Sequence, residues 1–147
     1  MRVDSILPLA QKRMVTIRED ASVAEASDLL SGTHRALLVV VNRDGAMVGV
    51  VTKTDVVRQV AQRHDAISGR RISAVMTQQV TSCRTNDPLN DVLALMKKKG
   101  FVHIPIIDAN SRPCGVVNAR DALQALLREV KDEELLLRAY VMGVGYH

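Results

Sequence analysis

The sequence predicts a mixed α/β (α+β) fold that contains two copies of one β-α-β-β-α unit. When residues 16–60 are moved forward by 66 positions, they align without a gap on residues 82–126. Within each copy, apolar runs of strand length alternate with stretches of helical spacing. At 147 residues, 47% of them hydrophobic, the chain can bury a substantial core. Because two copies are too few for a stacked array, we expect them to pack through their sheets with pseudo-twofold symmetry.

The match between the two copies is closest at their ends. Residues 49–55 have the sequence GVVTKTD and residues 115–121 have the sequence GVVNARD, so the glycine, both valines and the aspartate are identical. Elsewhere the copies agree in chemical type, and the apolar positions 36–41 align on 102–107. The repeat therefore keeps apolar and turn positions in register.

The first unit is predicted to begin with a short strand and a capped helix. Residues 15–17 form the strand. Ser22 and Glu25 have capping-box spacing, in which the serine side chain accepts a hydrogen bond from a backbone N–H and the glutamate reaches back. We therefore expect a helix from this cap to about Leu30.

A β-hairpin and a second helix are predicted to complete the first unit. Residues 36–41 are an uninterrupted apolar run, residues 42–45 (NRDG) favour a turn, and residues 47–51 are apolar and rich in valine. Thr52 can cap the following helix. The apolar positions of that helix recur at helical spacing, at Val56, Val57, Val60 and Ala61.

The second unit repeats this order with different cap residues. We expect Asp87 as the N-cap of its first helix, Pro88 at the first helical position and Gly100 as the C-terminal stop. Residues 101–107 match the central strand of the first unit, and Asn118 takes the capping position of Thr52.

These elements divide the chain into four parts. We expect a first unit over residues 1–62, a connector over 63–73, a second unit over 74–128 and a C-terminal helical extension over 129–147. The last helix is predicted to run from Ala119 to Met142, because this stretch contains no proline or glycine. The charged residues 131–134 interrupt its apolar spacing, so a kink or the start of a second helix at this point is an alternative.

Composition argues against several classes of protein. No apolar run approaches the roughly 20 residues that a membrane span needs, and the N-terminus has no signal-peptide pattern, so we expect a cytoplasmic protein without membrane association. Cys83 and Cys114 lack metal-ligand spacing, so we expect reduced core thiols and no metal site. We expect no enzyme activity and no catalytic residues, because no nucleophile-base pair or phosphate-binding loop is recognisable.

The charge balance alone does not identify a partner. The net charge is +4 and the sequence pI is 9.4, which suits an anionic ligand or a nucleic acid. One Phe, two Tyr and no Trp provide few surfaces on which bases could stack. Nucleic-acid binding is therefore the least favoured of the candidate functions.

The joint pattern resembles a tandem pair of CBS domains, also called a Bateman module. The resemblance rests on the capped first helix, on the segment GFVHIPI at residues 100–106 and on the two endings GVV[T/N]xxD. It covers roughly residues 14–127. It implies a stand-alone homodimeric module that binds adenosine-containing ligands in clefts between its units, such as AMP, ADP, ATP, NAD or S-adenosylmethionine. No catalytic cofactor is implied, and a regulated partner protein would read the dimer conformation.

The resemblance also implies roles for individual residues. Thr52 would approach ribose or phosphate, and Asp55 and Asp121 would accept hydrogen bonds from the ribose hydroxyls. Both motifs begin a helix, whose free N–H groups favour phosphate. Strand residues would contact the adenine, with His103 and Arg120 beside base and phosphate. The predicted ligand-binding residues are Thr16, Ala36, Leu37, Thr52, Asp55, Thr81, Ser82, Val102, His103, Ile104, Pro105, Asn118, Arg120 and Asp121.

Each cleft departs from the family pattern in one place. Val39 aligns with Pro105, and residues 34–36 (HRA) replace the Gly-Phe-Val that leads into the second strand, so the first cleft has the less typical base pocket. Asn118 replaces threonine in the second cleft, but asparagine still caps a helix, and the second cleft is the preferred one. Purely structural interpretations stay open, since both motifs are also helix caps and His103 suits a partly buried structural position.

A function of a different class is an interaction scaffold. In that interpretation the clefts bind no nucleotide, and the apolar C-terminal helix docks a partner protein.

Overall fold

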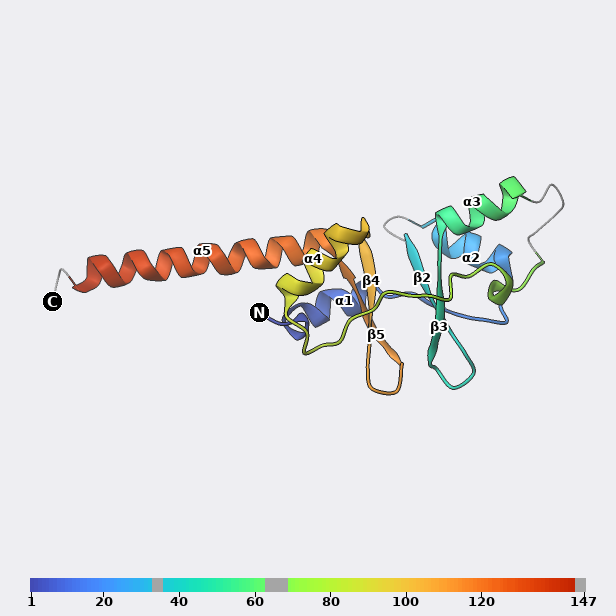
Figure 1. Ribbon diagram of the computed structural model, residues 1–147, viewed down its shortest axis with the longest axis horizontal. Helices are drawn as coiled ribbons and strands as arrows, with labels where there is room; N and C mark the ends of the chain where they lie inside the picture. Colours follow the sequence, from blue (N-terminus) through green and yellow to red (C-terminus); the bar gives the residue numbers. More distant parts are fainter. Residues whose placement is uncertain (33–35, 63–68, 145–147) are drawn as a thin grey trace.

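In the computed structural model, which describes residues 1–32, 36–62 and 69–144, two α/β units lie side by side and a long helix projects from one end (Figure 1). The elements of the first unit are β1 (Thr16–Arg18), α2 (Val23–Leu30), β2 (Leu37–Val41), β3 (Met47–Thr52) and α3 (Lys53–Gln62). Those of the second are α4 (Leu89–Lys99), β4 (His103–Ile107), β5 (Pro113–Asn118) and α5 (Ala119–Val144). The expectations for residues 34 and 35, and for most of the connector at 63–68, lie outside the described residues.

The predicted helix boundaries are confirmed at four places. The Ser22 side chain accepts from the Glu25 backbone N–H at 3.2 Å, and Thr52 Oγ1 accepts from that of Asp55 at 3.3 Å. Asn118 Oδ1 accepts from the Asp121 N–H at 3.1 Å. Gly100 ends α4 with φ 71°, a left-handed conformation that glycine adopts without strain.

The predicted cap of α4 is wrong by one residue. The helix begins at Leu89, and its N-cap is Pro88, which has an extended conformation (φ −61°, ψ 130°) and whose carbonyl accepts from the Val92 N–H at 3.2 Å. The Asp87 carboxylate instead accepts from the Arg84 N–H at 2.8 Å. Asp87 therefore closes the turn before the helix, because aspartate hydrogen-bonds readily to nearby backbone in turns.

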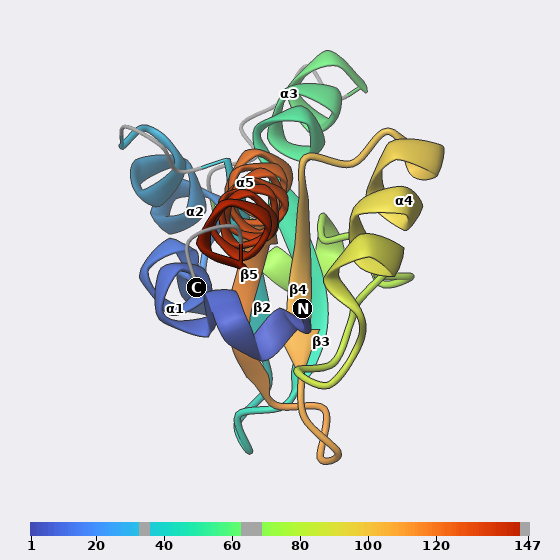
Figure 2. The same ribbon diagram turned by 90° about the vertical axis from the view of Figure 1, so that its left-hand side faces the viewer.

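The C-terminal helix α5 is continuous over 26 residues, so residues 131–134 cause no break. Lys and Glu are good helix formers and a single Asp costs at most about 0.7 kcal/mol, while Glu134 pairs with Arg138 at 2.8 Å. The helix leaves the second unit and extends away from it (Figures 1 and 2). Among the described residues, no helix combines the length and apolarity needed to cross a bilayer.

Two short sheets form the centre of the molecule. In the first unit, β1 pairs in parallel with β2, which pairs antiparallel with β3. In the second, β4 and β5 are antiparallel, and a single parallel bridge from Cys83 to Ile106 takes the place of β1. Helices lie on the outer side of each sheet (Figure 1).

The inner faces of the two sheets meet, as predicted. Alternate strand residues point to opposite faces, and Leu38, Val40 and Val51 belong to the core of the first unit. Val39 and its cross-strand partner Val50 therefore face the other way, and both are buried.

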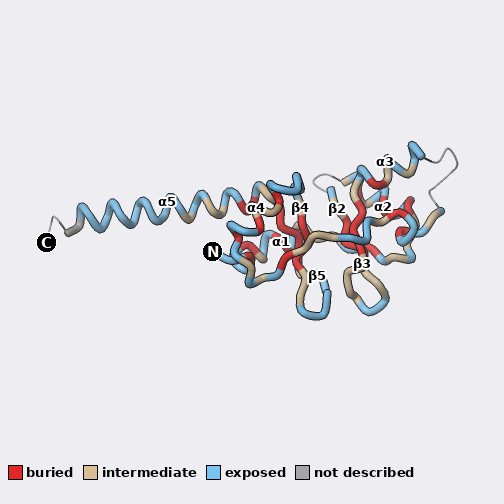
Figure 3. The backbone as a smooth tube through the Cα atoms, in the orientation of Figure 1, coloured by how far each residue is buried: buried red, intermediate tan, exposed pale blue. Residues whose placement is uncertain are grey.

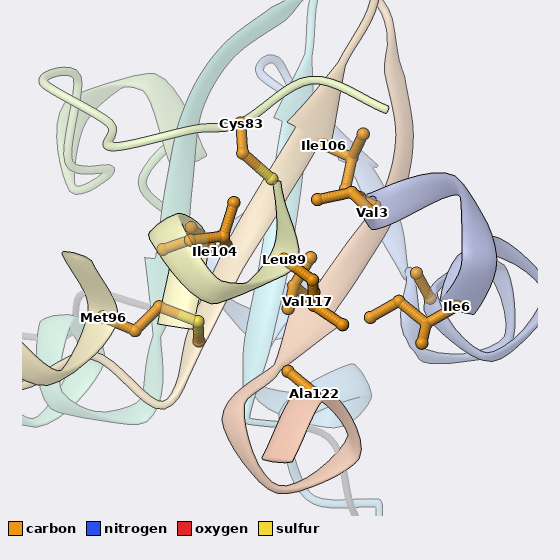
Figure 4. Close-up of a cluster of buried hydrophobic side chains, with 11 residues drawn as sticks. Val3, Ile6, Cys83, Leu89, Met96, Ile104, Ile106, Val117 and Ala122 are labelled. Atoms are coloured by element: carbon orange, nitrogen blue, oxygen red, sulfur yellow. The ribbon is translucent and has the colours of Figure 1, made fainter. Parts of the chain in front are cut away.

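Each unit completes its core with a segment from elsewhere in the chain. Val3 and Ile6, from a short 3₁₀ helix (Val3–Ile6), are buried in the core of the second unit (Figure 4). Ala10, from helix α1 (Leu7–Arg13), belongs to the same core. Ile72, from a 3₁₀ helix (Ile72–Ala74), and Val75 are buried in the core of the first. The two cores form separate buried regions, one around β4 and β5 and the other around β2 and β3 (Figure 3). Packing therefore crosses the unit limits predicted from the sequence.

The segments that complete the two cores, which we call the crossing segments, explain why glycine occurs at both Gly49 and Gly115. A Cβ atom on Gly49 would lie 2.7 Å from the Thr77 carbonyl oxygen and 2.8 Å from Met76 Sδ. A Cβ atom on Gly115 would lie 2.9 Å from the Ala10 Cβ. Both distances are shorter than van der Waals contact, so each position needs glycine for close backbone approach.

The two cysteines are both free thiols. Cys83 is buried as predicted, and burial raises the pKa of its thiol to about 12. Cys114 is only partly buried, so its environment is less core-like than expected, although partial burial also raises the pKa of this thiol. The buried Cys83 is therefore the less reactive thiol.

Candidate functional site

A cleft of about 500 Å³ lies between the two units. This volume is within the usual range for small-molecule sites. One side is the N-terminal end of α3, and the other is β4 with the segments that precede it. Its lining comprises Ala36, Leu37, Val50, Thr52, Thr54, Asp55, Arg58, Thr77, Gln79, Val80, Thr81, Gly100, Phe101, Val102, His103, Ile104 and Pro105.

The cleft combines the two parts that the sequence pattern makes most typical. It joins the Thr52 and Asp55 cap of the first unit to the second-unit strand that contains Pro105. Nine predicted residues line it: Ala36, Leu37, Thr52, Asp55, Thr81, Val102, His103, Ile104 and Pro105. The predicted residues that do not line it are Thr16, Ser82, Asn118, Arg120 and Asp121.

Several lining residues were missed by the sequence-based prediction. Thr77, Gln79 and Val80 come from the segment between the 3₁₀ helix Ile72–Ala74 and α4, and Arg58 lies one turn into α3. Phe101 was part of the quoted motif but was not selected as a contact. Arg58 could have been found because it follows Asp55 at helical i,i+3 spacing, whereas nothing local marks Thr77 or Gln79.

Asp55 is the polar centre of the cleft and is 7% exposed. Its Oδ2 accepts from the Thr52 N–H at 2.9 Å and from the Thr52 hydroxyl at 3.1 Å, and its Oδ1 accepts from the Thr77 hydroxyl at 3.2 Å. Arg58 Nη1 lies 3.6 Å from Oδ1. A carboxylate has about four acceptor positions, so the group is held in place and can still accept from a ligand.

The opposite side of the cleft is apolar. Phe101 and Val102 line it and remain 44% and 58% exposed. Ile104 and Pro105 lie deeper, on buried positions of β4. A flat heterocycle on these side chains would bury apolar surface, and Phe101 offers an aromatic face for stacking.

His103 connects the cleft to the cap of α5. Asn118 Oδ1 accepts from the Asp121 N–H, so Asn118 Nδ2 is the atom 3.0 Å from His103 Nε2. An amide NH₂ only donates, so Nε2 accepts and the ring proton is on Nδ1. Burial and the nearby Arg13 lower the pKa of His103, while Asp121 acts in the opposite sense. The ring is therefore neutral at pH 7.

Asp121 has a different environment from Asp55. Arg13, the last residue of α1, donates from Nε to Oδ2 at 2.6 Å and from Nη2 to Oδ1 at 2.9 Å. This hydrogen bonding raises the pKa of Arg13. The pair is bidentate, the strongest geometry for an arginine and a carboxylate, and it joins two residues 108 positions apart.

Comparison with known proteins agrees with this architecture. The sequence model of the CBS domain matches residues 3–62 and 72–128. An uncharacterized 17.7 kDa protein of Acidianus ambivalens is 29% identical over 119 residues, which are 81% of this chain and 71% of that protein. Other relatives are much longer: the homoserine O-acetyltransferase of Methanococcoides burtonii is 26% identical over 80% of this chain, which spans only 23% of that protein.

Solved structures show the same fold. A CBS-domain containing protein from Agrobacterium tumefaciens has a TM-score of 0.73 and 27% identity, covering 84% of this chain and 92% of that one. A CBS domain pair solved in complex with 5′-methylthioadenosine and S-adenosyl-L-methionine has a TM-score of 0.71 and 24% identity, covering 88% of this chain and 97% of that one. With the family model matched in both repeats, this chain belongs to the CBS domain family.

Proposed function

We propose that this protein is a regulatory module that binds an adenosine-containing small molecule in the cleft between its two units. The observation that carries the proposal is the pairing, in one cleft, of a fixed carboxylate with an apolar wall. Asp55 would accept from a ribose hydroxyl, and Phe101, Val102 and Pro105 would contact the adenine. Thr52 and the first N–H groups of α3 would lie near the 5′ substituent.

The chemistry of the lining supports a nucleoside. A ribose hydroxyl donates a hydrogen bond, which suits an ionised carboxylate that only accepts and already uses three of its about four acceptor positions. The adenine ring presents a flat apolar face, which suits the exposed side chains at residues 101 and 102. A solved relative of the same fold contains 5′-methylthioadenosine and S-adenosyl-L-methionine, and we use these two compounds with AMP, ATP and NAD as probes.

The signal would pass through a dimer. We propose a homodimer in which ligand binding favours one of two arrangements, because a ligand shifts an equilibrium only by its different affinity for the two states. A regulated partner protein would then bind one arrangement more tightly than the other.

Isothermal titration calorimetry and thermal denaturation with the five probes test the proposal, with GMP as the control. At a concentration of a hundred times Kd, a ligand stabilises the native state by about 2.7 kcal/mol. We expect at least one adenosine compound to bind and GMP to bind much more weakly. Failure of all five probes to bind would overturn the proposal.

A matched pair of variants tests the position of the site. Asp55→Asn keeps the size of the side chain but removes its charge, and we expect affinity to fall at least tenfold, which is about 1.4 kcal/mol. Asp121→Asn makes the same change at the repeat-related position outside the cleft. Equal affinity of wild type and Asp55→Asn would show that the ligand binds elsewhere.

A scaffold is the second candidate function, and the surface of α5 favours it. Leu136, Leu137, Tyr140 and Val141 are each at least 65% exposed on the part of the helix that leaves the second unit. Such a surface is typical of a protein contact. This candidate is supported if the protein binds none of the probes but binds a partner protein through α5.

A further inference from the structure

The two repeats present the same carboxylate in two different states. Asp55 and Asp121 are 7% and 8% exposed, and each is the third residue after its helix cap. Asp55 faces the cleft and is hydrogen-bonded by hydroxyl and backbone groups. Asp121 is held by two N–H donors of the Arg13 guanidinium, from Nε and Nη2. The difference therefore lies in what faces each carboxylate.

The repeat relation extends beyond the aligned sequences and identifies the counterpart of Arg13. Ala10 packs against Gly115, and the Met76 side chain with the Thr77 carbonyl packs against the repeat-related Gly49. The spacing between these residues is 66 positions in both cases, since 76 − 10 = 66 and 115 − 49 = 66. Three residues after Ala10 comes Arg13, and three residues after Met76 comes Gln79, which lines the cleft that contains Asp55.

We propose that Arg13 is an internal occupant of the second, repeat-related site, so that each chain binds one adenosine ligand, at Asp55. This inference rests on the proposed function and deepens it, because it determines which of the two sites accepts a ligand. Arg13 supplies two adjacent N–H donors to the two oxygens of Asp121, which is the pattern that a ribose diol would supply. Gln79 carries no charge, so this segment brings no cation to Asp55, which keeps about one acceptor position beside its three hydrogen bonds.

The strength of the two interactions decides the competition. The pair of Arg13 and Asp121 is charge-assisted and bidentate, with the carboxylate side chain 9% exposed and the arginine side chain 30% exposed. The carboxylate is ionised with either donor, but the guanidinium adds a full positive charge and a fixed two-pronged geometry that ribose hydroxyls lack. Neutral ribose hydroxyls would have to displace the guanidinium and leave its charge without its partner. A ligand therefore binds at Asp55, where the corresponding segment contributes the Thr77 hydroxyl and no guanidinium.

The test is the number of ligands bound per chain, measured by calorimetry with 5′-methylthioadenosine or whichever of the five probes binds most tightly. Arg13→Gln copies Gln79, and we expect the number to rise from one to two. Adding Asp121→Asn to Arg13→Gln should return the number of bound ligands to one. Asp121→Asn alone should leave the number of bound ligands and the affinity at their wild-type values. Arg13→Lys keeps the charge but cannot bind both oxygens, and it should bind the second ligand more weakly than Arg13→Gln.

Two ligands per wild-type chain, or a number that stays at one in Arg13→Gln, would overturn the inference. A double-mutant cycle for unfolding by urea, with Arg13→Gln and Asp121→Asn, tests the contact without any ligand. We expect the coupling to change the unfolding equilibrium constant about tenfold. If no probe binds the wild type but the coupling is present, the proposed function fails and the contact stands, whereas absence of coupling would contradict the inference directly.

Discussion

The carboxylate positions of the two units differ in their surroundings, although both belong to the same helix-start motif. In the first unit Asp55 lies in a cleft beside Thr77 and Gln79, which come from the connecting segment. In the second unit the corresponding segment ends α1, and its Arg13 binds Asp121. The motif alone therefore does not identify the ligand site, because a crossing segment supplies the residue that faces it.

The difference teaches how a duplicated unit acquires two roles from one fold. Both units need a segment that packs over the glycine of their motif and completes their core, and each segment also brings one side chain to the carboxylate. A neutral side chain there leaves the carboxylate facing the cleft, and a cationic one forms a structural ion pair. One residue can thus change the number of sites without changing the fold.

The largest expected effect tests whether the two crossing segments are equivalent. We expect Gly49→Ala and Gly115→Ala each to lower the free energy of unfolding by about 2 kcal/mol, because a new Cβ would overlap the segment that crosses it. Urea denaturation measures both. Gly69→Ala is the control, since no atom lies within 4 Å of its added Cβ. A loss at only one of the two glycines would show that the segments are not packed alike.

The next effect compares the two ion pairs. Arg13 and Asp121 are bidentate and partly buried, while Arg58 is 57% exposed and lies 3.6 Å from Asp55. Double-mutant cycles with Arg→Gln and Asp→Asn should give a coupling of about 1.5 kcal/mol for the first pair and at most about 0.5 kcal/mol for the second. Adding 0.5 M NaCl should reduce the smaller coupling by the larger fraction, since exposed pairs are screened more strongly. Equal couplings would mean that the two carboxylates are held equally strongly by their arginines.

The extent to which the sequence predicted the site follows from the range of the interactions. Ser22, Thr52, Asn118 and Gly100 act within a few residues of themselves, so their spacing was sufficient to predict the caps. Both halves of the cleft were recognised, as Thr52 with Asp55 and as the strand around Pro105, but they were assigned to different clefts. The preferred second cleft combined Pro105 with Asn118 and Asp121, neither of which lines the cleft observed. These signals are local, and only the cap and aspartate of the helix-start motif occur in both units.

The remaining features depend on contacts between distant parts of the chain. The pair of Arg13 and Asp121 spans 108 positions, and no local pattern marks it. The same is true of Thr77, which donates to Asp55 across 22 positions. Asp87 was assigned to the helix cap because aspartate and proline favour several neighbouring positions, and only the backbone dihedral angles distinguish them. The packing of each crossing segment in the core of the other unit likewise could not be predicted from any single stretch of sequence.

A smaller effect concerns a cross-strand pair that differs between the units. His103 lies opposite Asn118 and accepts a hydrogen bond from its amide, while Leu37 lies opposite Thr52 at the same register. His103→Leu and Asn118→Thr should each cost about 1 kcal/mol, since each leaves a polar partner without its hydrogen bond. The double variant copies the first unit, and urea denaturation should show a loss well below the sum of the two. Strict additivity would mean that the two side chains act independently.

The smallest effect is a dependence of stability on pH that originates at His103. Burial and Arg13 lower the pKa of this ring in the folded state, against the opposite influence of Asp121, while the unfolded chain has the ordinary value of about 6.5. The unfolded state therefore binds a proton first, so the contribution of the neutral ring is complete above about pH 6.5 and is lost as the pH falls below it. His103→Gln keeps an acceptor for Asn118 but does not titrate. Between pH 8 and pH 5 the wild type should lose more stability in urea denaturation than His103→Gln, and parallel losses would show that the ring takes up its proton as readily in the folded protein as in the unfolded chain.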